Sequence, residues 1–181
     1  MKKLNLGCGY DVRKGYINID NIKNKGVDMV FNLNKYPYPF KNNSIDEIYC
    51  CHILEHLNDF DKTIKEFHRI LKKDGMIIII VPDFSSCNAY VPVHKTFFNL
   101  NSFNLYCSNI HDRSIKQPLF KMIEKKLLFP FEHMKGWKKF IVMLYYLMPL
   151  MVYDANKNIY MIFLSRIFPA SETYFKLKAV K

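Results

Sequence analysis

Residues 45–83 read IDEIYCCHILEHLNDFDKTIKEFHRILKKDGMIIIIVPD, which predicts a strand, a helix and a second strand in close succession. The first strand covers 45–52 and is mostly apolar, as expected for a strand that is covered on both faces. Asn58 or Asp59 can cap the helix, because a short side-chain oxygen accepts hydrogen bonds from free backbone N–H groups. The isoleucine-rich run 76–81 is typical of a buried parallel strand. This order of elements indicates an α/β protein.

The predicted helix carries a single apolar stripe, formed by Phe60, Ile64, Phe67 and Leu71. Lys72 and Lys73 follow in its last turn, where the helix dipole favours cations. Gly75 is expected to end the helix, because glycine readily adopts the left-handed conformation that terminates helices.

Three shorter strands are predicted before this stretch, at 3–6, 16–20 and 27–33. Strands that alternate with helices indicate a doubly wound, mostly parallel, Rossmann-like sheet, in which ligands bind at the carboxyl ends of the strands. We expect residues 1–181 to form one domain whose first half, 1–83, binds the ligand.

The composition of the chain is that of one globular domain. Its 181 residues are 50% hydrophobic and 24% charged, which excludes a disordered tail and a collagen-like fibre. The five cysteines include no C-x-x-C pair, and the N-terminus does not resemble a signal peptide. These features predict a cytoplasmic protein.

The net charge of +11 comes almost wholly from the second half of the chain. Residues 1–83 hold 13 basic and 11 acidic side chains, whereas residues 84–181 hold 14 basic and 5 acidic ones. Lysine outnumbers arginine by 23 to 4, and arginine is the better bidentate reader of phosphate. A solvated lysine-rich surface is the first interpretation. An anionic acceptor, RNA or an acidic membrane surface stays open.

Polar or small residues follow each of the first strands. Gly7-Cys8-Gly9 lets backbone N–H groups approach a ligand without a Cβ in the way. The third glycine of a dinucleotide fingerprint is missing, and the short distance to Asp20 leaves little room for a helix that would bind a pyrophosphate. NAD binding is therefore disfavoured. The Asp20 carboxylate can instead accept both hydroxyls of a ribose.

Two further strand ends carry groups of interest. Asn32 and Leu33 can meet the edge and the face of an adenine. His52-Ile53-Leu54-Glu55-His56 matches the H-x-x-E-H pattern of inverted zinc peptidases, which requires both histidines on one face of a helix. Because His52 directly ends a strand, the pair is expected to span a strand-to-loop junction. We therefore expect no metal.

The chain combines these features in a fixed order, with the motifs LNLGCG (4–9), NID (18–20), VDMVFNL (27–33), HILEH (52–56) and LKKDGMIIIIVP (71–82). Over residues 3–83 this order resembles the small class I S-adenosylmethionine-dependent methyltransferases, in a compact form without an N-terminal cap domain. The resemblance implies S-adenosylmethionine as the cofactor and an antiparallel last strand in the sheet.

The resemblance also implies roles for particular residues. Gly7, Cys8 and Gly9 would lie along the methionine part of the cofactor, Asp20 on its ribose, Asn32 and Leu33 at its adenine, and Cys51 and His52 near the reactive centre. The chain departs from the family at two places. Many members carry an aspartate where this chain has Asn32, and a longer first helix where it has residues 10–14.

Residues 84–170 are expected to form a helical segment that supplies the acceptor site. Pro118 is predicted to open a helix that runs through Phe129, and a second helix is predicted from Gly136 to Tyr146. Residues 157–168 fit either a helix or a strand. The alternation within 171–181 predicts a terminal strand with one face buried, formed by Phe175, Leu177 and Ala179.

Residues 140–148 are almost wholly apolar and follow a group of lysines. The run is too short to cross a bilayer, which takes about 20 residues. A buried helix is the first interpretation. Peripheral contact of 135–153 with an anionic membrane is the alternative.

The function predicted from these features is O-methylation of a small-molecule or glycan acceptor. Removal of the hydroxyl proton suits a side chain that titrates near neutrality. His94 is the first hypothesis for this base, because it follows the isoleucine-rich strand, and His52, His56 and His111 are rivals. An RNA methyltransferase and a non-catalytic binding module with the same fold stay open as alternatives. The sequence leaves the oligomeric state undetermined.

Overall fold

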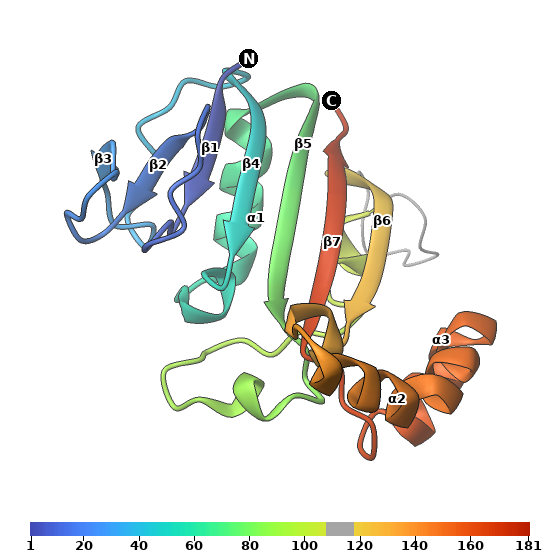
Figure 1. The fold of residues 1–181 in the computed structure, drawn as a ribbon. Helices are drawn as coiled ribbons and strands as arrows, with labels where there is room; N and C mark the ends of the chain where they lie inside the picture. Colours follow the sequence, from blue (N-terminus) through green and yellow to red (C-terminus); the bar gives the residue numbers. More distant parts are fainter. Residues whose placement is uncertain (108–117) are drawn as a thin grey trace.

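The computed structural model of the chain describes residues 1–107 and 118–181, which contain a seven-stranded sheet of order β3-β2-β1-β4-β5-β7-β6 (Figure 1). Its strands are β1 (Lys3–Leu6), β2 (Ile17–Asp20), β3 (Met29–Val30), β4 (Ile45–Cys51), β5 (Leu71–Pro82), β6 (Phe120–Leu128) and β7 (Glu172–Ala179). The first five strands pair in parallel, and β7 lies antiparallel between β5 and β6. The predicted strand arrangement and the antiparallel last strand are confirmed. The order reverses between β1 and β4, the point at which such sheets bind ligands.

Helix α1 (Phe60–Ile70) covers one face of this sheet, as Figure 1 shows. The Asp59 carboxylate caps it by accepting a hydrogen bond from the backbone N–H of Lys62 at 2.9 Å. The apolar stripe of the helix is fully buried in the core and consists of Ile64, Phe67 and Ile70. These residues pack with β1, β4, β5 and β7, so the predicted helix is confirmed. Of the predicted stripe, Ile64 and Phe67 are buried in the helix, Phe60 is partly buried and Leu71 lies in β5.

Helix α1 ends at Ile70, so the predicted end at Gly75 is wrong. Leu71 is fully buried and already pairs with Ile45 in the sheet, so β5 begins directly after α1. Lys72 and Lys73 therefore belong to the strand, which has an irregular register before Met76. Sheet pairing and burial of Leu71 outweigh the local preference of this segment for helix.

The opposite face of the sheet carries no α-helix within the described ranges. Residues 7–16 connect β1 to β2 through turns, as the short spacing predicted. The connection is held by the buried Asn5, whose amide donates to the carbonyl of Asp11 at 2.7 Å. The Arg13 guanidinium lies over the Tyr49 ring, 3.5 Å from its centroid, and covers part of this face. A doubly wound strand order is thus combined with helical cover on one face.

The region 84–170 is not the helical segment that the sequence predicted. Residues 120–128, expected as a helix opened by Pro118, form β6 and pair along the whole of β7. The helices of this half are α2 (Trp137–Ala155) and α3 (Lys157–Ile159), with short turns η2 (Cys87–Tyr90), η3 (Asn104–Tyr106), η4 (Pro130–His133) and η5 (Tyr160–Leu164). The ambiguous segment 157–168 is therefore largely helical.

Helix α2 lies at the end of the sheet where β5 and β6 finish (Figure 1), and it is mostly exposed. It is anchored through Tyr153, whose hydroxyl accepts from the backbone N–H of Leu127 at 3.0 Å, and Tyr146, whose hydroxyl donates to the carbonyl of Pro169 at 2.9 Å. The first interpretation of 140–148 as a buried helix is wrong, because Tyr146 is its one buried residue. Among the described residues no helix combines the length and apolarity that a membrane span requires.

Candidate functional site

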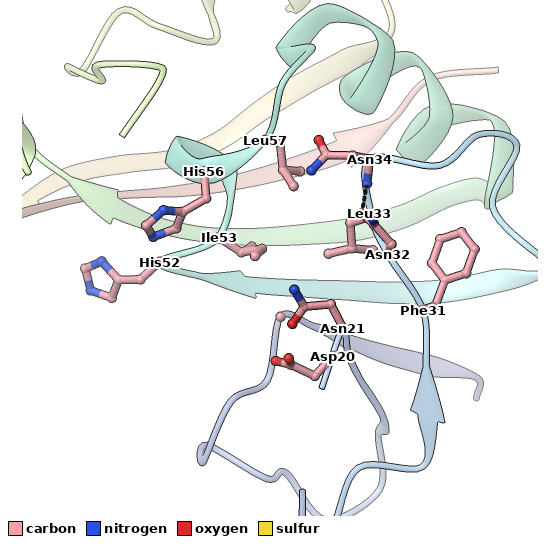
Figure 2. A pocket seen from close by; sticks show the side chains of 11 residues that line it. Asp20, Asn21, Phe31, Asn32, Leu33, Asn34, His52, Ile53, His56 and Leu57 are labelled. Atoms are coloured by element: carbon pink, nitrogen blue, oxygen red, sulfur yellow. Dashed lines mark hydrogen bonds between the residues drawn. The ribbon is translucent and has the colours of Figure 1, made fainter. Parts of the chain in front are cut away.

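A pocket of about 320 Å³ opens at the carboxyl ends of β1, β2 and β4, beside the strand-order reversal (Figure 2). This volume lies within the range of small-molecule sites. The pocket is lined by Gly7, Asp20, Asn21, Phe31, Asn32, Leu33, Asn34, His52, Ile53, His56 and Leu57. The structure thus brings together five of the eight residues expected to bind the cofactor: Gly7, Asp20, Asn32, Leu33 and His52.

Backbone conformation and close packing both require a glycine at position 7. Its φ is +66°, in the left-handed region that side chains rarely adopt. A Cβ at this position would also lie 2.5 Å from Cγ1 of Ile53, which projects into the pocket in Figure 2. Gly9 has a φ of +49°, but a Cβ there would meet nothing within 4 Å. Close packing is therefore confined to the first of the two glycines.

Asp20 joins the glycine turn to the pocket. Its Oδ2 accepts from the backbone N–H of Gly9 at 2.8 Å, and its Oδ1 accepts from the backbone N–H of Ile22 at 3.2 Å. Both hydrogen bonds fix the carboxylate at the end of β2, where it lines the pocket. A carboxylate oxygen has lone pairs for more than one donor, so acceptor capacity remains for a ligand hydroxyl.

Asn32 and Leu33 form the side of the pocket after β3. The Asn32 side chain accepts from the backbone N–H of Asn34 at 2.9 Å, which holds the turn and leaves the amide nitrogen as a donor (Figure 2). Leu33 is buried and Phe31 lines the same side. This side therefore offers an apolar surface with a polar edge.

Cys8, Gly9 and Cys51 do not line the pocket. The side chain of Cys8 is buried in the fold, and Gly9 contributes through its hydrogen bond to Asp20. Burial raises the pKa of both thiols, Cys8 and Cys51, so neither is a ready thiolate nucleophile. Neither cysteine is therefore placed to contact a ligand in the pocket as a nucleophile.

His52 directly follows β4 in a strained conformation, with a φ of +52°. Its Nε2 lies 2.7 Å from Oε1 of Glu172, and its Nδ1 lies 3.3 Å from Oε1 of Glu55. The hydrogen bond with Glu172, together with the Glu55 carboxylate, raises the pKa of His52 to about 9. Both ring nitrogens thus face carboxylates at the mouth of the pocket.

His56 and His94, the other two expected bases, lie against each other. Their ring centroids are 4.7 Å apart in an edge-on arrangement. His94 arrives from the loop after β5, which is docked by the backbone N–H of Lys95 donating to the carbonyl of Glu55 at 2.7 Å. One ligand atom each from Glu55, His56 and His94 lies within 4.8 Å of the others, a grouping that can hold a metal ion. His111, the remaining rival, lies outside the described residues.

Sequence reasoning missed several lining residues, of which Ile53 is the most informative. It belongs to the HILEH motif, but only the fold places it against Gly7. Asn21 and Leu57 directly follow an expected site residue, so adjacency was the one available signal for them.

Comparisons with known proteins agree with this geometry. Residues 4–79 match a protein-family model described as a methyltransferase domain. An uncharacterised protein of Methanocaldococcus jannaschii is 33% identical over 81 residues, which are 39% of this chain and 36% of the relative. The aligned region thus spans about a third of that curated relative.

Two solved structures share the fold at low sequence identity. Phosphoethanolamine N-methyltransferase 2 of Haemonchus contortus, solved in complex with S-adenosyl-L-methionine, has a TM-score of 0.60 and 17% identity, covering 100% of this chain and 50% of that one. A SAM-dependent methyltransferase from Archaeoglobus fulgidus has a TM-score of 0.59 and 16% identity, covering 98% of this chain and 85% of that one.

The family match, residues 4–79, includes every residue that lines the pocket, and the structural likeness covers nearly all of the chain. The pocket lies at the reversal point of the sheet, next to the glycine turn and the acid of β2. Residues 4–79 are thus similar to a methyltransferase-domain family, and the chain as a whole shares the fold of S-adenosylmethionine-dependent methyltransferases.

Proposed function

We propose that this chain transfers the methyl group of S-adenosylmethionine to a hydroxyl oxygen of a small molecule or glycan. The observation that carries the proposal is the group of histidines at the mouth of the pocket. His52 and His56 line the pocket, and His94 contacts His56. A base beside the methyl donor suits a hydroxyl acceptor, because the hydroxyl must lose its proton during transfer.

The orientation of the cofactor follows from the chemistry of the lining. Asp20 accepts the ribose hydroxyls, and Phe31 and Leu33 lie against the adenine. The methionine part then extends along Gly7 toward His52. The acceptor oxygen forms a bond to the methyl carbon while the carbon–sulfur bond breaks, and the sulfonium becomes the neutral thioether of S-adenosylhomocysteine. The hydroxyl proton passes to the base.

His94 is the base in this proposal. The two ring nitrogens of His52 face Glu172 and Glu55, so His52 has no nitrogen free for an acceptor proton. The Nδ1 of His94 lies 3.1 Å from the carbonyl of Ala89. Since a carbonyl only accepts, Nδ1 carries the proton and Nε2 keeps the free lone pair.

Exposed aromatic side chains near His94 favour a glycan among the acceptors. Tyr90 and Phe97 are 63% and 53% exposed, and their ring centroids are 5.4 Å apart. They lie on either side of His94 in the same loop. Both rings offer flat apolar faces on which a sugar can pack.

Replacing His94 with alanine should lower turnover by about 100-fold or more, the usual contribution of a general base. Turnover is measured as S-adenosylhomocysteine formed against a panel of hydroxylated small molecules and oligosaccharides. The dissociation constant of S-adenosylhomocysteine, measured by calorimetry, should stay unchanged. His68→Ala is the matched control, because His68 lies on α1 and contacts Phe120 and Val180.

Other outcomes of this experiment have clear meanings. Turnover that survives in His94→Ala and is lost in His52→Ala contradicts the assignment of the base. If the chain methylates RNA, and its affinity for RNA falls steeply as the salt concentration rises, the acceptor is RNA instead of a glycan. Binding of S-adenosylhomocysteine without turnover on any acceptor favours a binding module.

We also propose that α2 and the following turns rest on an anionic membrane surface. Exposed apolar side chains cover this region, among them Trp137 (71%), Met151 (67%) and Phe163 (67%). Lys138 and Lys139 lie in the first turn of α2, where the helix dipole disfavours cations and where an external anion would compensate their charge. In a membrane, anionic lipid headgroups would pair with the lysines and the acyl layer would cover the exposed apolar side chains.

The wild-type chain should float with vesicles containing phosphatidylserine and stay behind with vesicles of phosphatidylcholine alone. Phe140→Glu/Leu144→Glu should abolish flotation, because both side chains are more than half exposed and the charges enter the apolar surface. Ile22→Glu, also exposed but at the other side of the molecule near β2, is the matched control. Flotation that is equal for both vesicles, or unaffected by the double substitution, contradicts membrane contact.

A further inference from the structure

We infer that Glu55, His56 and His94 bind a divalent transition-metal ion beside the cofactor pocket. One ligand atom from each of these side chains lies within 4.8 Å of the other two. Glu55 and His56 belong to the short turn η1 (Leu54–His56), and His94 comes from the loop after β5. Metal–ligand bonds of roughly 2.0–2.2 Å require the three atoms to surround one point, and their mutual separation is compatible with that.

The buried carboxylate of Glu55 is the first observation that supports this site. Its side chain is 2% exposed, and within the described residues neither of its oxygens accepts a hydrogen bond. His52 approaches one of them, Oε1, at 3.3 Å, and is itself shared with Glu172. Burial of a carboxylate is costly unless positive charge compensates it, and a cation held by Glu55, His56 and His94 would add to the partial compensation that His52 supplies.

The ring of His94 is already oriented as a metal ligand. Its Nδ1–H donates to the carbonyl of Ala89 at 3.1 Å, so the lone pair is on Nε2. Histidine ligands usually donate their other N–H to a carbonyl or carboxylate, which fixes the ring and its tautomer. His56 has its ring edge-on to His94, so both imidazoles reach the same space.

The donor set defines the class of ion. Two imidazole nitrogens and one carboxylate oxygen suit Zn²⁺, Fe²⁺ or Co²⁺, whereas Mg²⁺ and Ca²⁺ prefer oxygen ligands. Three protein ligands leave coordination positions open for water or substrate. The H-x-x-E-H pattern pairs His52 with His56, but the fold turns His52 toward Glu172 and brings in His94 instead.

This inference extends the proposed function, on which its catalytic meaning rests. His56 lines the cofactor pocket, so an acceptor hydroxyl on the ion would lie close to the methyl donor. A metal ion lowers the pKa of a bound hydroxyl, which eases loss of its proton. In the metal-free protein His94 takes that proton directly, and in the metal-bound protein it serves as a ligand.

Cobalt titration of the full chain, first treated with chelator and then dialysed, tests the site. We expect one Co²⁺ per chain, with visible d–d absorption typical of nitrogen and oxygen ligands, and competition by Zn²⁺. Glu55→Gln and His94→Ala should each weaken binding by at least about 10-fold, since ligand loss costs no less than loss of a supporting residue. His68→Ala should bind as the wild type does. All titrations use the Cys87→Ser background, because Cys87 is exposed and binds soft metals by itself.

Absence of stoichiometric binding at micromolar metal overturns the inference, as does full affinity in His94→Ala. If Glu55→Gln fails to fold, as judged by circular dichroism, His94→Ala decides, because His94 is only partly buried. The proposed function is tested separately by methyl transfer in the presence of chelator. Methyl transfer without metal binding contradicts the metal site alone. Metal binding without methyl transfer contradicts the proposed function alone.

Discussion

Gly7→Ala should abolish binding of S-adenosylmethionine and destabilise the fold by about 3 kcal/mol, the sum expected for a left-handed alanine and an overpacked contact. The new methyl group would lie 2.5, 2.7 and 2.8 Å from three side-chain carbons of Ile53. Either Ile53 is displaced into the pocket or the turn after β1 moves away from the cofactor. The measurements are urea denaturation and calorimetry with S-adenosylhomocysteine.

Gly9→Ala is the matched control, because it has a comparable backbone conformation and an empty surrounding. It should lose about 1 kcal/mol from backbone strain alone and keep most of its cofactor affinity. Gly7→Ala/Ile53→Ala should recover stability relative to Gly7→Ala, since the colliding carbons are removed. If Gly7→Ala and Gly9→Ala lower the free energy of unfolding by the same amount, packing against Ile53 has no role.

Asp20→Asn should weaken the binding of S-adenosylmethionine and S-adenosylhomocysteine by about 100-fold. The carboxylate holds the backbone of Gly9 and Ile22, and in the proposed function it also accepts from the ribose. Hydrogen bonds to a charged acceptor contribute about 1.5–3 kcal/mol each, and an amide replaces one acceptor by a donor. Calorimetry with the two compounds measures the loss.

Two comparisons separate ribose recognition from damage to the turn. Adenine alone, which has no ribose hydroxyls, should bind wild type and Asp20→Asn with the same affinity. Asp11→Asn changes another acid of the same region, one that is paired with Arg13 at the surface, and should bind the cofactor normally. Equal weakening of adenine and S-adenosylhomocysteine would assign the effect to the turn instead of the ribose.

The last strand illustrates where the sequence was sufficient. Phe175, Leu177 and Ala179 alternate with lysines, and this alternation predicts both the strand and its buried face. The Gly7–Gly9 turn and Asp20 were likewise identified from their places after strands. In each case the signal is local, because one strand and the residues that follow it carry the whole pattern.

Strand β6 shows where a local signal misled. Its residues include five charged or exposed positions and follow Pro118, which favours the start of a helix. The segment is nevertheless a strand because it lies at the edge of the sheet and pairs with β7, more than forty residues later in the chain. An edge strand with one solvated face has a weak pattern of its own, so the pairing decides its structure.

The α/β class, the helix after β4, the antiparallel last strand and the residue types at the strand ends could all be predicted from the residues alone, because periodicity and strand-end chemistry are local properties. The tertiary structure alone decided which of these residues meet. It turned His52 toward Glu172, placed His94 beside Glu55 and His56, and packed Ile53 on Gly7. The physical reason is that these contacts join segments that the chain separates, and only the closing of the sheet and its loops brings them within bonding distance.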